Sequence, residues 1–281
     1  MSRVIDPHIH LFNLKEGQYT WLQEGNEPNW PNKATIHRDY IEGDLKLNPP
    51  AALEGFVHIE AGFDNDEPWR ELAWLEEHCQ LPFKSIAYGN IEAETFSEQL
   101  EELSKFGSLV GIRFILDQNA ANLLSNRIVK QNLSMLADKG LLFEAQLPLS
   151  DPLAVDALSS IMAGLPQLKV VINHTGSPDK LSENWMNSIM RLAHHPECFI
   201  KCSGWEMFNP DWDTLSIKPM ISFAIRQFGL ARVMLASNFP VSELSCSYAE
   251  LWQRYLEEMK WKGFEKDMLV YENAKRIYQF D

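Results

Sequence analysis

Recurring short apolar runs are the feature of this sequence that most constrains its fold. Eight runs rich in apolar and β-branched residues are separated by longer stretches with helical spacing. Nearly continuous apolar runs of this length are typical of parallel strands that are covered on both faces. The runs read RVIDPHIH (3–10), EGFVHIE (54–60), KSIAYGNI (84–91), SLVGIRFI (108–115), LLFEAQL (141–147), KVVINH (169–174), CFIKCSG (198–204) and RVMLASN (232–238).

The stretches between these runs predict helices. In EPWRELAWLEEHC (67–79), the spacing of Trp69, Leu72 and Leu75 places them on or near one helical face. Helices are also expected over 94–105, 121–139, 151–163, 181–195, 214–228, 246–260 and 272–279.

Strands that alternate with helices in this number predict an α/β fold, a (β/α)8 TIM barrel that occupies residues 1–281 as a single domain. A doubly wound open sheet is the main alternative. Its dinucleotide-binding form is disfavoured, because no G-x-G-x-x-G follows the first strand.

The longest irregular stretch covers residues 11–53, where Gly, Asn and Pro are scattered among aromatic residues. It is too long for an ordinary strand-to-helix loop. We expect an insertion between the first strand and the first helix that covers the functional site; a poorly ordered insertion is the alternative. Its aromatic residues Tyr19, Trp21 and Trp30 are expected to carry specificity, and Trp21 to contact a substrate.

Composition narrows the class of partner. The 25 basic and 39 acidic residues give a net charge of −14, which argues against nucleic acid or an anionic membrane as the main partner. The N-terminal sequence MSRVIDPHIH lacks the apolar region of a signal peptide. Four scattered cysteines predict free thiols and no disulfide scaffold. These features predict a cytoplasmic protein that acts on a small molecule.

Polar residues stand at the C-terminal ends of all the predicted strands except the third. TIM barrels carry their chemistry at this end, and residues two apart on a strand share a direction. His8 and His10 are therefore expected to point the same way with Asp6 beneath them, and His58 to pair with Glu60. The remaining strand ends offer Arg113, Glu144, Gln146, His174, Lys201, Ser203 and Asn238.

The histidines at these ends predict a metal site. Two imidazoles on one face suit a shared cation, and His174 on another strand end supplies a third nitrogen. We predict one divalent metal, with zinc as the expected ion, held by His8, His10 and His174. For an isolated strand histidine such as His58, a hydrogen-bonded structural role is the alternative.

The charged strand ends predict substrate contacts. An arginine after Gly111 suits a carboxylate, which Arg113 can bind through two hydrogen bonds, although it could also cap the barrel mouth. Lys201 can bind substrate or form an internal ion pair with Glu144. We predict Arg113, Gln146, Lys201 and Ser203 as ligands of an acidic or sugar-derived substrate.

Several motifs together resemble a known family. DPHIH (6–10), the His174-Thr-Gly strand end, KCSG (201–204), LASNFPV (235–241) and ENAKRIYQF (272–280) are similar to the amidohydrolase-related sugar lactonases and pyrone-dicarboxylate lactonases. Gly111-Ile-Arg113 and the stretch from YTWL (19–22) to HRDYIEGDL (37–45) also match. The resemblance implies a TIM barrel that hydrolyses small lactones. It also implies that operation without a divalent metal is possible, because some members of the group need none.

Two positions depart from the pattern of that family. Asn173 precedes His174 where an aspartate is common. Ser237-Asn238 ends the last strand where the usual pair is Ser-Asp, so Asn238 stands in place of the aspartate. Lactone opening needs an activated water and a proton for the leaving alkoxide. The Asn238 amide has no basicity near neutral pH and can only orient water.

Asn238 therefore leaves three outcomes open. A metal on the three histidines could activate the water, or His174 or Glu60 could be the base while Asn238 positions it, or the barrel could bind a ligand without catalysis. A metal-dependent amidohydrolase-type decarboxylase is a further alternative, which Asn238 disfavours. We expect hydrolysis, because the other polar strand ends are intact.

Overall fold

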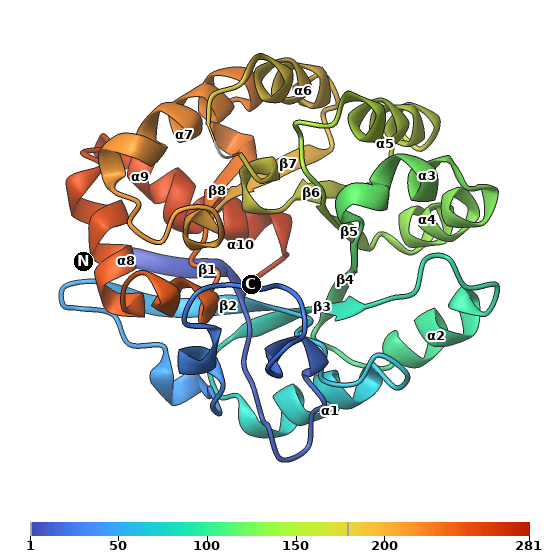
Figure 1. Cartoon of the computed structure of the whole chain (residues 1–281), viewed down its shortest axis with the longest axis horizontal. Coiled ribbons are helices and arrows are strands. Elements are labelled where there is room, and N and C mark those ends of the chain that lie inside the picture. Colours follow the sequence, from blue (N-terminus) through green and yellow to red (C-terminus); the bar gives the residue numbers. More distant parts are fainter. Residues whose placement is uncertain (1, 179) are drawn as a thin grey trace.

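A computed structural model describes residues 2–178 and 180–281 of the chain. Its eight strands form one sheet in the order of the sequence, and each pairs in parallel with the next (Figure 1). The strands are β1 (Arg3–Ile9), β2 (Ala52–Ile59), β3 (Phe83–Tyr88), β4 (Leu109–Ile115), β5 (Leu142–Gln146), β6 (Val170–Ile172), β7 (Cys198–Cys202) and β8 (Val233–Leu235).

The last strand returns to the first. A parallel bridge joins Ile9 to Phe239, and the backbone N–H of His10 donates to the Phe239 carbonyl at 2.7 Å. The Asn238 N–H donates to the carbonyl of His8 at 2.9 Å. These contacts close the sheet just past the end of β8, and the predicted TIM barrel is confirmed.

Helices surround the sheet, as Figure 1 shows. They are α1 (Trp69–His78), α2 (Phe96–Leu103), α3 (Ala120–Ser125), α4 (Arg127–Lys139), α5 (Pro152–Gly164), α6 (Glu183–Ala193), α7 (Thr214–Phe228), α8 (Tyr248–Gln253), α9 (Gly263–Asp267) and α10 (Asn273–Ile277).

Most predicted helix boundaries differ from the structure by one or two residues, and two of the predicted helices differ further. The helix expected over 121–139 is divided at Asn126, which is extended and caps α4 by accepting from the Ile128 N–H. Asparagine is a preferred N-cap residue because its side chain satisfies a free backbone donor. The last helical segment starts earlier than expected, at Gly263, and includes a π-helical turn over Met268–Glu272.

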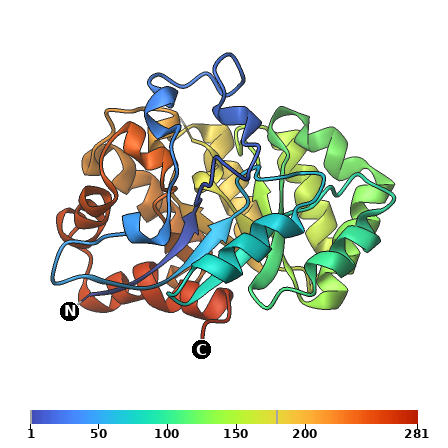
Figure 2. The same cartoon turned by 90° about the horizontal axis from the view of Figure 1, so that it is seen from below.

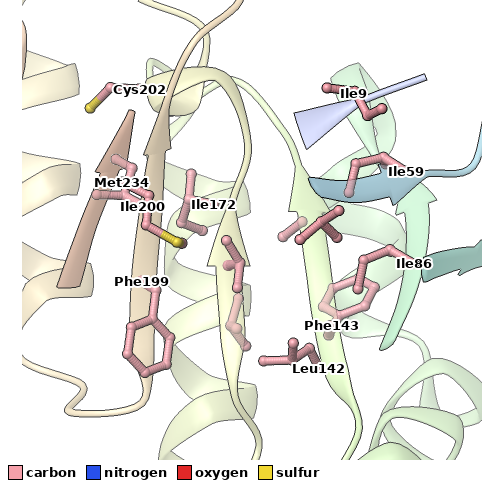
Figure 3. Close-up of a cluster of buried hydrophobic side chains, with 14 of the residues drawn as sticks. Ile9, Ile59, Ile86, Leu142, Phe143, Ile172, Phe199, Ile200, Cys202 and Met234 are labelled. Carbon is pink, nitrogen blue, oxygen red and sulfur yellow. The ribbon is translucent and has the colours of Figure 1, made fainter. Parts of the chain in front are cut away.

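Apolar side chains of the strands form the core. Figure 3 shows part of it, in which Ile86, Phe143 and Ile200 from three different strands are among the buried side chains. Each of these side chains is completely buried. Cys198 and Cys202 of β7 are also buried and free, as expected for thiols that pack as small apolar groups.

The two ends of the barrel are covered differently. Figure 2 shows the segment after β1 at the upper end and the C-terminal helices at the lower end. Residues 52 and 53 of the predicted insertion 11–53 belong to β2. The rest of the segment occupies the place of a helix between β1 and β2, and its only helical elements are short 3-10 turns, so the helix labelled α1 follows β2. Among the described residues, no helix is long and apolar enough to cross a membrane.

Candidate active site

A cavity of about 700 Å³ opens at the C-terminal ends of the strands. The segment 11–53 supplies part of its wall through aromatic and polar side chains, and the strand ends supply the rest. From the segment come Thr20, Trp21, Glu27, Pro28 and Trp30, and from the strand ends come His10, Glu60, Tyr88, Arg113, Gln146, His174 and Asn238.

Two tryptophans form the aromatic part of the wall. The Trp21 indole N–H donates to the carbonyl of Ala61 at 2.7 Å, and the Trp21 and Trp30 rings lie 6.0 Å apart in an edge-to-face arrangement. Tyr19 of the same segment is buried elsewhere, where its hydroxyl accepts from the Asn13 N–H at 2.9 Å. Trp21 and Trp30 thus line the cavity and Tyr19 does not, so the expected role of Tyr19 is wrong; contact of Trp21 with a substrate stays a prediction.

Arg113 is held on one side of the cavity by a network of hydrogen bonds. Its Nε donates to Oε1 of Glu60 at 2.8 Å, and Nη2 donates to the Glu60 carbonyl at 2.7 Å. Nη1 donates to Oε1 of Gln146 at 3.3 Å. Because a guanidinium has five N–H groups, two remain for a ligand. The charge of Arg113 is already balanced by Glu60.

His8, His10 and His174 lie together, with the His8 ring 5.0 Å from His10 and 4.6 Å from His174. Burial lowers the pKa of each imidazole well below its usual range, and the cations of Arg113 and Lys201 lower the pKa of His8 and His174 further. The positive charge of Arg113 also lowers the pKa of His10. All three rings are therefore neutral near pH 7.

The hydrogen bonds of the rings set their tautomers. His10 Nδ1 lies 2.8 Å from the Ile59 carbonyl, so it carries the proton and leaves a lone pair on Nε2. His8 Nδ1 lies 3.4 Å from the Lys201 ammonium, a donor, so the proton of His8 is on Nε2. His8 Nε2 is buried and has no protein partner among the described residues.

This arrangement does not fit the metal site expected from the sequence. Within residues 2–178 and 180–281, no three His, Cys, Asp or Glu side chains are arranged to hold a metal ion. A metal ligand must offer a lone pair, which Nε2 of His8 lacks while Lys201 donates to its Nδ1. The charges of Arg113 and Lys201 also disfavour a divalent cation between the rings. No catalytic step is therefore assigned to a metal.

Lys201 lies below the cavity, where it is completely buried. Its Nζ lies 2.7 Å from Oε2 of Glu144, whose Oε1 accepts from the Tyr278 hydroxyl at 2.5 Å. Asn173 donates to the same carboxylate. Burial lowers the pKa of Lys201 to about 8, although the neighbouring Glu144 opposes this shift. The internal ion pair, which was the alternative from the sequence, is the arrangement found.

Ser203 also lies behind the cavity wall. Its hydroxyl is 3.1 Å from Nδ1 of His174, and the side chain is buried. Neither Lys201 nor Ser203 is among the residues that line the cavity. Direct substrate contact, predicted for both, is thus replaced by support of His8 and His174.

Gly204 makes room for His174. Its φ of +75° is easily adopted only by glycine, and a Cβ at this position would lie 2.8 Å from Nδ1 of His174. His174 itself has a φ of 51°, an uncommon conformation for a residue with a side chain. Strained backbone of this kind is often found where a functional side chain must be held in one direction.

Asn238 also has a positive φ, of 61°. Its Nδ2 donates to Oε1 of Glu206 at 2.6 Å, and both side chains are almost completely buried. Burial raises the pKa of the Glu206 carboxyl to about 7. The titratable carboxyl group of Glu206 therefore lies in direct contact with the side-chain amide of Asn238.

Side-chain alternation fails at two places. His58 Nε2 lies 3.0 Å from Oε1 of Glu71 on α1, whereas Glu60 reaches Arg113, so the expected pairing of His58 and Glu60 is wrong. The strand ends at Ile59, and alternation does not continue past it. His58 has the structural role that was its alternative.

Asp6 does not lie beneath His8 in the way that alternation suggests. Its carboxylate accepts from the backbone N–H groups of His8 and Ser237, both at 3.1 Å, and from the Trp252 indole at 3.3 Å. The register of β1 shifts between Asp6 and Ile9, which interrupts the alternation. Asp6 thus ties β1 to the end of β8.

Two of the polar groups at the site were not predicted from the sequence. Tyr88 ends β3 and lines the cavity, but the expected strand ran on to residue 91 and hid this end. Glu206 lies in the turn after β7, and only the folding of the chain brings it next to Asn238. Its position three residues after Ser203 was the one available signal.

Comparisons with known proteins agree with the barrel fold. The amidohydrolase family matches residues 5–280. The chain is 28% identical to the uncharacterized protein y4mH of Sinorhizobium fredii over 98% of both chains, and 23% identical to an L-fucono-1,5-lactonase of Burkholderia ambifaria over 88% of this chain and 87% of that one. An amidohydrolase from Burkholderia multivorans, solved with bound zinc, covers both chains completely with a TM-score of 0.81 and 19% identity. The chain belongs to the amidohydrolase family.

Proposed function

We propose that this protein hydrolyses a small, uncharged sugar-acid lactone. The observation that carries the proposal is the charge balance of the cavity wall. Arg113 is the only cation among the described lining residues, and Glu60 already neutralises it, while Glu27 and Asp117 add further carboxyl groups. A dicarboxylate such as a pyrone dicarboxylate would meet no free positive charge there.

The rest of the wall suits a sugar. Trp21 and Trp30 offer apolar ring surfaces, and amide and carboxyl groups such as those of Gln146 and Asp117 can bind hydroxyl groups. The lactonase relative supports the reaction class. A free carboxylate on the substrate, one of the two possibilities from the sequence, is disfavoured by this wall.

The side chains can carry out hydrolysis without further groups. Neutral His174 accepts the proton of a water molecule as the water oxygen attacks the lactone carbonyl carbon. Two free N–H groups of Arg113 stabilise the oxygen that becomes negative. His174 then returns the proton to the ring oxygen as the ring C–O bond breaks, which yields a hydroxy acid.

Glu60 is the weaker choice for the base. Its Oε1 is bound by Arg113 and its Oε2 accepts from the Gly62 N–H at 3.2 Å. Both oxygens of this carboxylate are therefore engaged by protein donors, which leaves them less available to a water molecule. In this proposal Glu60 positions Arg113, and Asn238 orients the water.

A lactone panel tests the proposal. Sugar lactones with five- and six-membered rings, a pyrone dicarboxylate and muconolactone are supplied separately, and acid release is followed with a pH indicator. At least one sugar lactone should exceed the charged lactones in kcat/KM by about a hundredfold. A preference for the dicarboxylate would overturn the substrate class. Ligand-induced stabilisation without turnover of any lactone would instead favour the binding barrel.

A further inference from the structure

Glu206 is a buried acid that the proposed chemistry has not used. It lies in the turn Trp205–Met207 after β7, and its side chain is 2% exposed. Its Oε1 accepts from Asn238 Nδ2 at 2.6 Å, whereas its Oε2 is buried without a partner among the described residues. Asn238 lines the cavity and Glu206 does not, so Glu206 can act on a ligand only through Asn238.

A carboxyl group in this position is costly for stability, because buried acids usually have a cation or several donors beside them. The titratable groups that act electrostatically with Glu206 are Tyr255 and Cys246, and neither can carry a positive charge. Glu243, on the neighbouring turn Val241–Leu244, is directed to Tyr40 and accepts its hydroxyl at 2.7 Å. A glutamine or leucine would fit a purely structural position better.

We propose that Glu206 is a positioning residue of the hydrolytic site, whose carboxylate fixes the Asn238 amide so that Oδ1 faces the cavity and accepts a hydrogen bond from the attacking water. The proposal rests on the proposed function. It assigns to Glu206 and Asn238 together the place that an aspartate holds at the end of the last strand in the lactonases that the sequence resembles.

The chemistry of the two groups explains the direction. An ionised carboxylate only accepts hydrogen bonds, so it must face Nδ2 of Asn238, which leaves Oδ1 for the water. Oδ1 then binds one O–H of the water, the other O–H points to His174, and the oxygen lone pair stays free for attack. An amide turned the other way would donate from Nδ2 to that lone pair and block the attack.

Protonation of Glu206 removes this control. A protonated carboxyl group both donates and accepts, so it is compatible with either direction of the amide. Burial raises the pKa of Glu206 to about 7, so the change in protonation falls near neutral pH. Turnover should therefore fall as the pH decreases through about 7.

The decisive variant is Glu206→Gln, which keeps the size of the side chain but can donate or accept at every pH. We expect kcat to fall about tenfold at pH 8 with KM changed by less than about twofold, and the step in the pH profile near 7 to disappear. Glu243→Gln is the matched control, since it removes a nearby acid that does not contact Asn238, and it should keep the native step. A native profile in Glu206→Gln would overturn the proposal.

A second measurement does not depend on turnover. In protein labelled with ¹⁵N at asparagine, the side-chain signals of residue 238 are assigned by their loss in Asn238→Asp and followed with pH in the free protein. They should shift with a midpoint near 7 in the native protein and not in Glu206→Gln. If these signals show the pairing of Glu206 with Asn238 but no lactone is hydrolysed, only the proposed function is overturned. Signals that do not move with pH in the native protein would defeat the role of Glu206.

Discussion

Arg113 Nε lies 2.8 Å from Glu60 Oε1, and both side chains are largely buried at the wall of the cavity. This pair joins the ends of β2 and β4, and it removes the positive charge that an anionic substrate would need. The same pair keeps the two remaining N–H groups of Arg113 in a fixed direction. In the proposed function, both the substrate class and the stabilisation of the carbonyl oxygen therefore depend on this one contact.

Replacing Glu60 should change the substrate preference. Glu60→Gln retains an acceptor for Arg113 and removes the opposing charge, so KM for an anionic lactone should fall about tenfold while KM for a neutral lactone changes little. Steady-state kinetics on one lactone of each kind give the comparison. Glu67→Gln, an exposed change of the same charge, is the control. Equal changes in KM for both lactones would show that Glu60 does not set the charge preference.

Filling the space beside His174 should reduce catalysis. Gly204→Ala places a methyl group about 2.8 Å from His174 Nδ1, so the ring must move and kcat should fall by about a hundredfold or more. Gly140→Ala is the matched control, because Gly140 has nearly the same backbone conformation (φ 69° and ψ 18°, against 75° and 21° for Gly204) and open space around it. Both variants share the backbone strain, and thermal unfolding measures it. A similar loss of kcat in both would assign the effect to strain.

Converting Asn238 to aspartate should move the pH profile. In Asn238→Asp two carboxyl groups share one buried site with Glu206, and they cannot both ionise easily. The step that lies near pH 7 in the native protein should rise by about one unit or more. In Glu206→Gln/Asn238→Asp the single acid accepts from an amide, so the step should fall below that of the native protein. Identical pH–rate profiles for the native protein and both variants would show that position 238 has no part in catalysis.

Metal removal should leave activity unchanged. The Lys201 ammonium donates to His8, which denies a metal the lone pair of that ring, so chelator treatment should keep at least about nine-tenths of kcat/KM. Elemental analysis of protein purified without chelator or added metal should give less than about a tenth of an equivalent of zinc, manganese or iron. A full equivalent together with loss of activity on chelation would restore the three-histidine metal site.

The barrel could be predicted because each strand carries its own signal. All the expected strand segments overlap those found, since buried parallel strands need continuous apolar runs. The helix boundaries were less certain, as the division at Asn126 shows. There a capping hydrogen bond, which periodicity does not reveal, decided the end.

The sequence predicts part of the cavity wall, but it does not predict that His8, Lys201 and Ser203 lie behind the wall. The polar strand ends gave His10, Glu60, Arg113, Gln146, His174 and Asn238, all of which line the cavity. The sequence does not show how deep in the barrel a strand residue lies. It predicts substrate contact for Lys201, whereas Lys201 lies below the cavity and pairs with Glu144. Glu206 comes from a turn, where no periodic rule applies, and its contact with Asn238 depends on the closed barrel.

Ring opening of a sugar lactone in H₂¹⁸O by the native protein and by His174→Asn tests whether water attacks the carbonyl carbon with His174 as the base. We expect the native product to carry one ¹⁸O in its carboxylate and none in the released hydroxyl, since water attacks the carbonyl carbon. His174→Asn should lose about 10²- to 10⁴-fold in kcat. Native activity in His174→Asn, or ¹⁸O in the released hydroxyl, would contradict this mechanism.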